Sequence, residues 1–236
     1  MDRSTAQKIL EILKAEFDLP ERVHMKKRPF ETLIKTILSQ STTSVNTERS
    51  FKRLTQKFKV SAEVLAHANV KEIEEAIQVG GLQRNKAKVI KAVSKKILEK
   101  FGGDLNFIYK RDIEESRKLL MSLPGVGPKT CDVTLLFSAG RPVMPIDTHI
   151  KRVSVRLGLS SEKTNYEETR EILQNLFPAE EYLTVHLALI ALGREYCRAR
   201  NPRCSSCPIR NFCPYASKTA VKERIKAQDK ASSQAS

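Results

Sequence analysis

The sequence has few residues that break regular structure, and it has no long apolar run. Nine glycines and ten prolines in 236 residues exclude a collagen-like or low-complexity chain. The longest mostly apolar stretch, residues 183–192, is interrupted by His186, so we expect no membrane-spanning helix. Residues 1–17 mix charges with an amphipathic pattern and lack the apolar core of a secretory signal. We therefore expect a cytosolic or nuclear protein whose thiols stay reduced.

Acidic residues are also scarce relative to basic ones. Asp and Glu number 27 against 42 Lys and Arg, which gives a formal net charge of +15. Such an excess favours a polyanionic partner, most often nucleic acid, although a soluble protein that is merely basic is the alternative. With 40% apolar and 29% charged residues, the chain is globular and long enough for one large domain or two small ones.

The apolar residues recur at helical spacing along most of the chain. They do so in residues 9–17, 30–38 and 89–98, and no run alternates strictly as a half-buried strand would. Glycine and proline separate these segments. The pattern predicts an all-α fold of about ten helices joined by short loops. Residues 217–236 are rich in Lys, Ala, Ser and Gln, and we expect a basic, flexible tail.

Four cysteines gather near the C-terminus in the pattern C-x6-C-x2-C-x5-C. They are Cys197, Cys204, Cys207 and Cys213. In a reducing compartment this density indicates a metal site rather than disulfides. Zinc sites usually show two CxxC pairs, and here there is one, so one compact loop around a [4Fe–4S] cluster is favoured over zinc.

Arginines crowd the same segment, with Glu195 as the only acidic residue among them. They are Arg194, Arg198, Arg200, Arg203 and Arg210. Their charge offsets that of a thiolate cluster, and those that point outward can meet phosphates. We therefore expect the metal to shape a DNA-binding loop. The fifth cysteine, Cys131, is expected to be a small buried thiol.

A glycine-containing turn separates two helical segments at residues 123–127. The sequence Leu-Pro-Gly-Val-Gly permits a tight turn whose backbone N–H groups, with the N-terminus of the next helix, can hold a phosphate. This is a helix-hairpin-helix signature, although a plain turn between helices can use the same residues. Pro128 suits the first helical position. Lys129 follows in the first turn, where the helix dipole disfavours a cation, so a neutral and nucleophilic amine is possible beside the commoner role of a phosphate contact.

A second polar motif lies 18 residues after this lysine. Asp147 precedes a helical segment and is expected to be its N-cap, which would also hold a carboxylate where it can assist a nucleophile and stabilise a developing cation. His149 is expected to be packed or hydrogen-bonded rather than catalytic.

These motifs stand in a fixed order: LPGVGPKT, then PIDTHI, then the four cysteines. Together, over roughly residues 5–215, they resemble the endonuclease III branch of the helix-hairpin-helix DNA glycosylases. The resemblance implies an all-α, two-lobed fold with a central cleft. A six-helix lobe would cover 30–141, and a cluster lobe would combine 1–29 with 142–216.

The resemblance also implies an activity. Relatives of this kind remove oxidised pyrimidines from duplex DNA after flipping the nucleotide out of the stack. Lys129 matches the catalytic lysine, which attacks C1′, expels the base and forms a Schiff base from which β-elimination cuts the strand. Asp147 matches the catalytic aspartate, which assists deprotonation of the lysine and stabilises charge on the sugar. The four cysteines match the ligands of a [4Fe–4S] cluster.

Several residues match DNA contacts of the family. Leu82 matches a wedge that intercalates beside the lesion, and Gln40 or Ser41 would fill the hole left by the flipped base. Further contacts are expected from the hairpin and the cysteine loop, at Leu123, Gly125, Val126, Gly127, Thr130, Arg200 and Arg203. The expected partner is duplex DNA with damaged bases or abasic sites. We expect the protein to bind it as a monomer and not to associate with a membrane. Its expected location is the cytoplasm of a prokaryote, at the nucleoid, or the nucleus of a eukaryote.

Two alternatives remain at this point. A monofunctional mismatch glycosylase, acting on thymine or uracil opposite guanine or on adenine opposite oxidised guanine, usually has Tyr or Ser at the position of Lys129. The second alternative is a non-catalytic DNA-binding or redox protein, and the presence of both Lys129 and Asp147 argues against it. The sequence departs from many relatives at Pro128, where they have a basic residue, and at Ser44, where they have an acidic one. These departures bear on damage preference and strand contacts.

Overall fold

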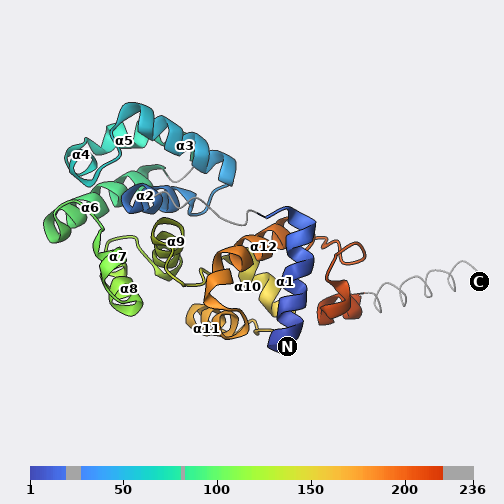
Figure 1. Ribbon diagram of the computed structural model, residues 1–236. Coiled ribbons are helices and arrows are strands. Elements are labelled where there is room, and N and C mark those ends of the chain that lie inside the picture. The colour runs from blue at the N-terminus through green and yellow to red at the C-terminus, as the bar shows by residue number, and fades with distance from the viewer. Residues whose placement is uncertain (20–27, 81–82, 220–236) are drawn as a thin grey trace, which may run out of the picture. The chain divides into compact units, whose positions relative to one another are not determined.

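The computed structural model describes residues 1–19, 28–80 and 83–219. Within these ranges the regular structure is helical and contains no strand, so the prediction of an all-α fold is confirmed (Figure 1). The described residues form slightly more helices than the roughly ten expected, and α4, α5 and α7 are short, with six, seven and four residues. Helices of one or two turns are too short for a periodic pattern to reveal them.

The chain divides into two compact units, Val23–Pro145 and Met1–Arg22 with Ile146–Ser236. The expected assignment of 30–141 and of 1–29 with 142–216 as lobes of a DNA-binding cleft stays a prediction. Among the described residues no single helix has the length and apolar composition to cross a membrane. Tyr166–Leu176 and Ala179–Glu195 meet that test only as a pair, which is bent by 114°.

The unit Val23–Pro145 is built around α2. Its helices are α2 (Pro29–Ser39), α3 (Ser44–Lys57), α4 (Ala62–His67), α5 (Val70–Ala76), α6 (Gln83–Phe101), α7 (Phe107–Lys110), α8 (Ile113–Met121) and α9 (Pro128–Ala139), with a 3-10 turn at Gln78–Gly80. The apolar residues Leu33, Ile34 and Ile37 of α2 are fully buried. Helices α3, α6 and α9 pack against α2 (Figure 1), so its apolar face forms much of the core of this unit.

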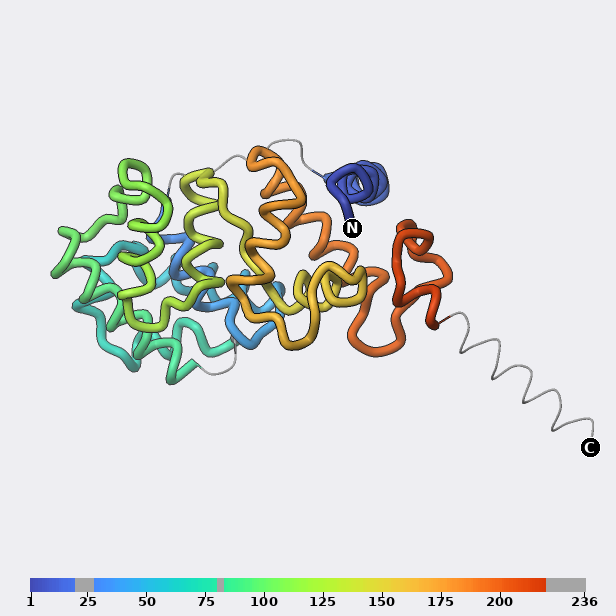
Figure 2. Tube along the Cα trace, turned by 90° about the horizontal axis from the view of Figure 1, so that it is seen from below, coloured from blue at the N-terminus to red at the C-terminus, as the bar shows by residue number. Residues whose placement is uncertain are grey.

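The other unit is built around α12 (Tyr182–Glu195), which α1 and α10 contact. Its remaining elements are α1 (Arg3–Phe17), α10 (Thr148–Arg156), α11 (Tyr166–Leu176) and 3-10 turns at Ala179–Glu181 and Arg210–Phe212. Gly193 allows α10 and α12 to approach closely, since a Cβ there would lie 2.8 Å from the Cβ of His149. After α12 the chain doubles back on itself through the cysteine segment (Figure 2).

Side-chain caps begin most of these helices, and they explain where the helices start. Asp2, Thr43, Ser61, Asn69 and Asp112 each accept a hydrogen bond from a backbone N–H of the first turn of their helix. Such caps satisfy N–H groups that have no partner inside the helix.

Candidate active site and iron-sulfur loop

The glycine turn joins α8 to α9 and has the conformation that the sequence predicts. Gly125 has φ +75°, and Pro128 is the first residue of α9, as expected. The N–H of Val126 donates to the carbonyl of Leu123 at 3.2 Å, which closes the turn. A Cβ on Gly125 would lie 2.4 Å from Cγ1 of Val89, so α6 packs directly against the turn at this glycine.

Lys129 is the second residue of α9, directly after this turn, and its side chain is partly exposed. The turn glycines Gly125 and Gly127 are exposed, whereas the side chains of Leu123, Val126 and Thr130 are buried. A contact of these three residues with DNA would therefore be made through the backbone. Backbone N–H groups at the start of a helix are well suited to phosphate.

Gln40 links the end of α2 to the turn. Its Nε2 donates to the carbonyl of Gly125 at 3.4 Å and to Oγ1 of Thr130 at 3.3 Å. The next residue, Ser41, is exposed and has φ +52°, a left-handed conformation that is uncommon outside glycine. The two candidates for filling the hole in DNA thus differ, because Gln40 already binds the turn in the protein alone.

Lys86 of α6 fixes the same end of α2. Its Nζ donates to the carbonyl of Leu38 at 2.7 Å, and burial lowers the pKa of its amine. The positive charge lies near the C-terminus of α2, where the helix dipole favours a cation. The expected wedge, Leu82, lies outside the described residues, as does most of the expected tail 217–236.

A buried ion pair that the sequence does not predict joins α8 to α9. Arg117 donates from Nε to Oδ1 of Asp132 at 2.8 Å and from Nη2 to Oδ2 at 3.4 Å. An aspartate within the apolar helical segment 131–137 is the sequence feature that could have revealed it. Cys131 beside it is fully buried, as predicted.

Asp147 is the N-cap of α10, as predicted, and its side chain is partly exposed. Its Oδ1 accepts from the N–H of Ile150 at 2.8 Å. A carboxylate at this position interacts favourably with the positive end of the helix dipole. His149 lies 3.0 Å from Nη2 of Arg152 through its Nδ1, so it is hydrogen-bonded, as expected. Lys129 belongs to the unit Val23–Pro145 and Asp147 to the other.

The four cysteines of the loop form no disulfide and are partly buried. Burial, reinforced by the charges of the other three cysteines, raises the pKa of the Cys207 thiol to about 11. Burial also raises the pKa of Cys204, again with contributions from Cys213 and Cys197. The four sulfurs therefore share one environment in which several thiolates need a cation to offset their charge.

Arg156 of α10 holds this loop from the helical side. Its guanidinium donates to the carbonyl of Arg198 at 2.7 Å, to that of Ala199 at 3.3 Å and to Sγ of Cys197 at 3.4 Å. It also lies 4.5 Å from the centre of the Tyr215 ring. In the other direction, the Cys213 thiol donates to the carbonyl of Arg156.

The donor set fits an iron–sulfur cluster. Within the described ranges no three His, Cys, Asp or Glu side chains converge closely enough to hold one metal ion. A cubane cluster has a different requirement, because each of its four irons takes one thiolate. Cys197, Cys204, Cys207 and Cys213 would hold it, and the guanidinium of Arg156 supplies positive charge beside them.

The remaining arginines of the loop lie toward solvent. Glu195 is within ion-pair distance of Arg203 and of Arg198, whereas Arg200 is exposed.

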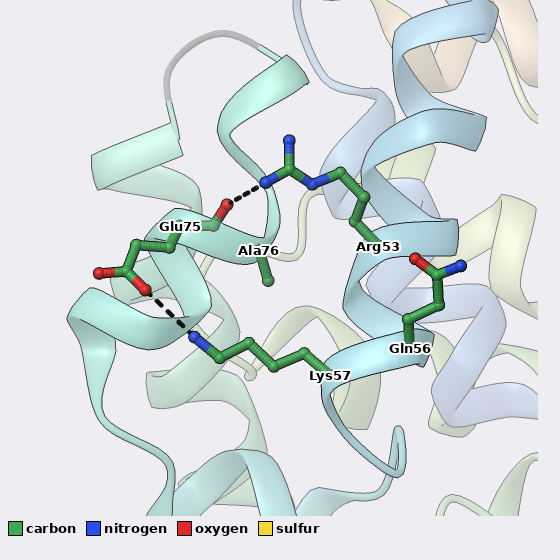
Figure 3. A pocket seen from close by; sticks show the side chains of 5 residues that line it. All are labelled: Arg53, Gln56, Lys57, Glu75 and Ala76. Carbon is green, nitrogen blue, oxygen red and sulfur yellow. Dashed lines mark hydrogen bonds and ion pairs between the residues drawn. The ribbon is translucent and has the colours of Figure 1, made fainter.

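A surface pocket of about 340 Å³ lies between α3 and α5. There Arg53 and Lys57 both point toward Glu75 (Figure 3), with hydrogen bonds to its backbone and side-chain oxygens. None of the predicted site residues lines that pocket.

The comparisons with known proteins agree with this arrangement. Residues 34–179 match the model of the HhH-GPD superfamily base excision DNA repair proteins, and residues 197–213 match the iron-sulfur binding domain of endonuclease III. Endonuclease III of Bacillus subtilis is 37% identical over 206 residues, which cover 87% of this chain and 89% of that one. Endonuclease III of Escherichia coli is 35% identical over 193 residues, covering 82% and 87%.

Solved structures give the same result. A trapped endonuclease III–DNA covalent intermediate superposes with a TM-score of 0.81 at 31% identity, covering 93% of this chain and 99% of that one. A thermostable thymine-DNA glycosylase, at 24% identity and a TM-score of 0.75, shares the fold.

The helical fold, the glycine hairpin and the matched region define a helix-hairpin-helix protein of base excision DNA repair. Within that class, the chain belongs to the endonuclease III family. It is a DNA glycosylase with an associated lyase activity, and it carries an iron–sulfur cluster, so both of these predictions are confirmed. The monofunctional alternative is not favoured.

Proposed function

We propose that Lys129 is the nucleophile of this activity and that the substrate is an oxidised pyrimidine in duplex DNA. The observation that carries the proposal is the position of Lys129, directly after the glycine turn and in the first turn of α9. The turn glycines are exposed, so their backbone can seat a phosphate of the damaged strand, and this would bring the neighbouring lysine within reach of the adjoining sugar.

In the proposed reaction, the lone pair of Nζ forms a bond to C1′ as the bond from C1′ to the base breaks. The base leaves with that electron pair and takes up a proton. A proton then moves from the attached nitrogen to O4′, the C1′–O4′ bond breaks to open the sugar ring, and a protonated Schiff base with a free O4′ hydroxyl results. A base then removes a 2′ proton, the C3′–O bond breaks, and the phosphate leaves. Water hydrolyses the Schiff base and restores the free amine.

Asp147 assists this sequence by accepting a proton from the lysine ammonium and by opposing positive charge on the sugar. Because Oδ1 also caps α10, an alanine at this position would remove a structural hydrogen bond together with the charge. Asp147→Asn keeps an oxygen for the cap and removes only the charge, so it is the variant that tests the chemistry.

The cluster supplies a rigid frame for the loop 197–213 when it is bound. Arg200 and Arg203 of that loop contact the phosphate backbone. Leu82 intercalates beside the lesion, and Gln40 or Ser41 fills the hole that the flipped base leaves. The protein acts as a monomer on chromosomal DNA, in the cytoplasm of a prokaryote or the nucleus of a eukaryote.

Borohydride trapping tests the proposal. The protein is incubated with duplex DNA containing thymine glycol, and hydride reduces the C=N bond to a stable amine that links protein and DNA. Lys129→Gln should bind the duplex and form no adduct, and Asp147→Asn should form it much more slowly. Lys118→Gln, on the exposed face of α8, is the matched control and should trap as the wild type does.

Other outcomes contradict the proposal in distinct ways. An adduct formed by Lys129→Gln would mean that another amine is the nucleophile. Trapping on abasic DNA without release of thymine glycol would refute the proposed substrate, and parallel duplexes with 8-oxoguanine or a G·T mismatch would then identify the base removed.

A further inference from the structure

The buried pair Arg117–Asp132 lies in the two helices that carry the glycine turn. The side chains are 4% and 0% exposed, and two hydrogen bonds join them side by side. This fork geometry constrains the orientation of both side chains, which a single contact between point charges does not. Arg117 also lies 3.3 Å from Glu114 on its own helix.

A buried ion pair is weak evidence for a contribution to stability. Burying two charges costs hydration energy that their attraction only partly offsets, and apolar residues of similar volume often stabilise a core as well or better. The core of this unit is rich in leucine, isoleucine and valine, so apolar residues at these two positions would suit it. The two directional hydrogen bonds of the pair do constrain how α9 can rotate and shift relative to α8.

The position of Asp132 relates this constraint to Lys129, three residues earlier on the same helix. Helix geometry places the two side chains about 60° apart around the axis and about 4.5 Å apart along it. A rotation of α9 by about 20° would move the end of a side chain by roughly 2 Å. Errors of about 1 Å in the placement of a reacting group can reduce a rate roughly 100-fold.

A second contact holds α9 from the end of α2, namely the hydrogen bond from Gln40 to Thr130. A rotation about the helix axis would strain that bond. It would also shift the turn before α9, which lies so close to α6 that a Cβ on Gly125 would clash with Val89. Three contacts therefore restrain α9 and the turn before it. They are the Arg117–Asp132 pair from α8, Gln40 from the end of α2, and Val89 from α6.

We infer that the Arg117–Asp132 pair is a positioning device for the nucleophile: its two hydrogen bonds fix the rotation of α9 and thereby aim the amine of Lys129. This inference rests on the proposed role of Lys129. Both side chains are buried, so we expect them to act through α9 and not by contact with the substrate.

Two variants test the inference. Arg117→Met/Asp132→Leu replaces the pair by apolar side chains of similar size, and Arg117→Lys keeps the charge but removes the fork. Thermal unfolding establishes that each is folded. Two quantities are then measured: the single-turnover rate of borohydride trapping at saturating abasic DNA, and the Kd for duplex with a tetrahydrofuran site, which cannot form a Schiff base.

We expect the double variant to trap about 10–100-fold more slowly than the wild type, and Arg117→Lys about 3–10-fold more slowly. The Kd of each should stay within about threefold of the wild-type value, because the turn that seats the phosphate remains. Glu167→Gln, which alters a less buried pair with Arg170 in the other unit, is the control and should leave both quantities unchanged.

A trapping rate equal to that of the wild type in either folded variant would overturn the inference. So would a loss of DNA affinity as large as the loss of rate, since that would show a general disturbance of the turn. These results leave the role of Lys129 itself intact, because only trapping by Lys129→Gln bears on it.

Discussion

The two glycines of the turn should respond very differently to the same substitution. At Gly125, a Cβ would lie 2.4 Å from Cγ1 of Val89 and 3.5 Å from its Cγ2, and φ is +75°. A left-handed conformation costs a non-glycine residue about 1–2 kcal/mol, and overpacking costs about 1–3 kcal/mol. Val89 is β-branched and cannot easily change its rotamer within α6. Gly125→Ala should therefore lower the free energy of unfolding by about 2–5 kcal/mol.

Gly127 provides the matched control. Its φ is −91°, and a Cβ would meet nothing within 4 Å. Alanine is a poorer N-cap than glycine, but it also restricts the unfolded chain, and the two effects are of similar size. Gly127→Ala should stay within about 0.5 kcal/mol of the wild type.

Thermal unfolding followed by circular dichroism measures both. For a chain of this length, Gly125→Ala should lower Tm by about 4–20 °C and Gly127→Ala by no more than about 2 °C. Equal shifts, or a larger one for Gly127→Ala, would refute the reasoning. A loss of DNA affinity by the stable Gly127→Ala variant would report directly on the contact between turn and phosphate.

Three further substitutions have defined outcomes. Arg156→Gln removes positive charge and hydrogen bonds from the cysteine loop, so the visible absorbance of the cluster should decay roughly tenfold faster in air, with helical content unchanged. Asn165→Ala removes the capping box of α11 and should lower the free energy of unfolding by about 1 kcal/mol in urea; an unchanged midpoint would contradict this. Burial lowers the pKa of Lys86 in the folded protein, so below pH 10.5 there is a range in which only the unfolded chain keeps this proton. Wild-type stability should therefore rise relative to Lys86→Met as pH increases toward 10.5, and parallel curves of stability against pH would argue against it.

Features set by short stretches of sequence could be predicted. The turn at Leu123–Gly127, the helix start at Pro128 and the cap at Asp147 each depend on residues within one helical turn, and all three were predicted. The spacing of the four cysteines likewise pointed to an iron–sulfur loop before any fold was known.

Features that join distant segments were missed. Gln40 and Thr130 lie 90 positions apart, and Arg117 and Asp132 lie 15 apart on separate helices. Helical periodicity shows which face of a helix is buried, but it does not show which polar groups meet inside that face. An aspartate in an apolar segment indicates that a partner exists without naming it.

The loop 197–213 contains one fully buried apolar side chain, Ile209. In contrast, α12 and the helices that contact it bury many apolar side chains. Hydrophobic burial therefore contributes little to the folding of this loop, which depends instead on metal binding and on the hydrogen bonds from Arg156. Iron shortage would then yield a chain whose helices are intact and whose basic loop has lost its shape. Such a protein would pass tests of solubility and helical content while repairing DNA poorly, so iron content is the proper measure of an active preparation.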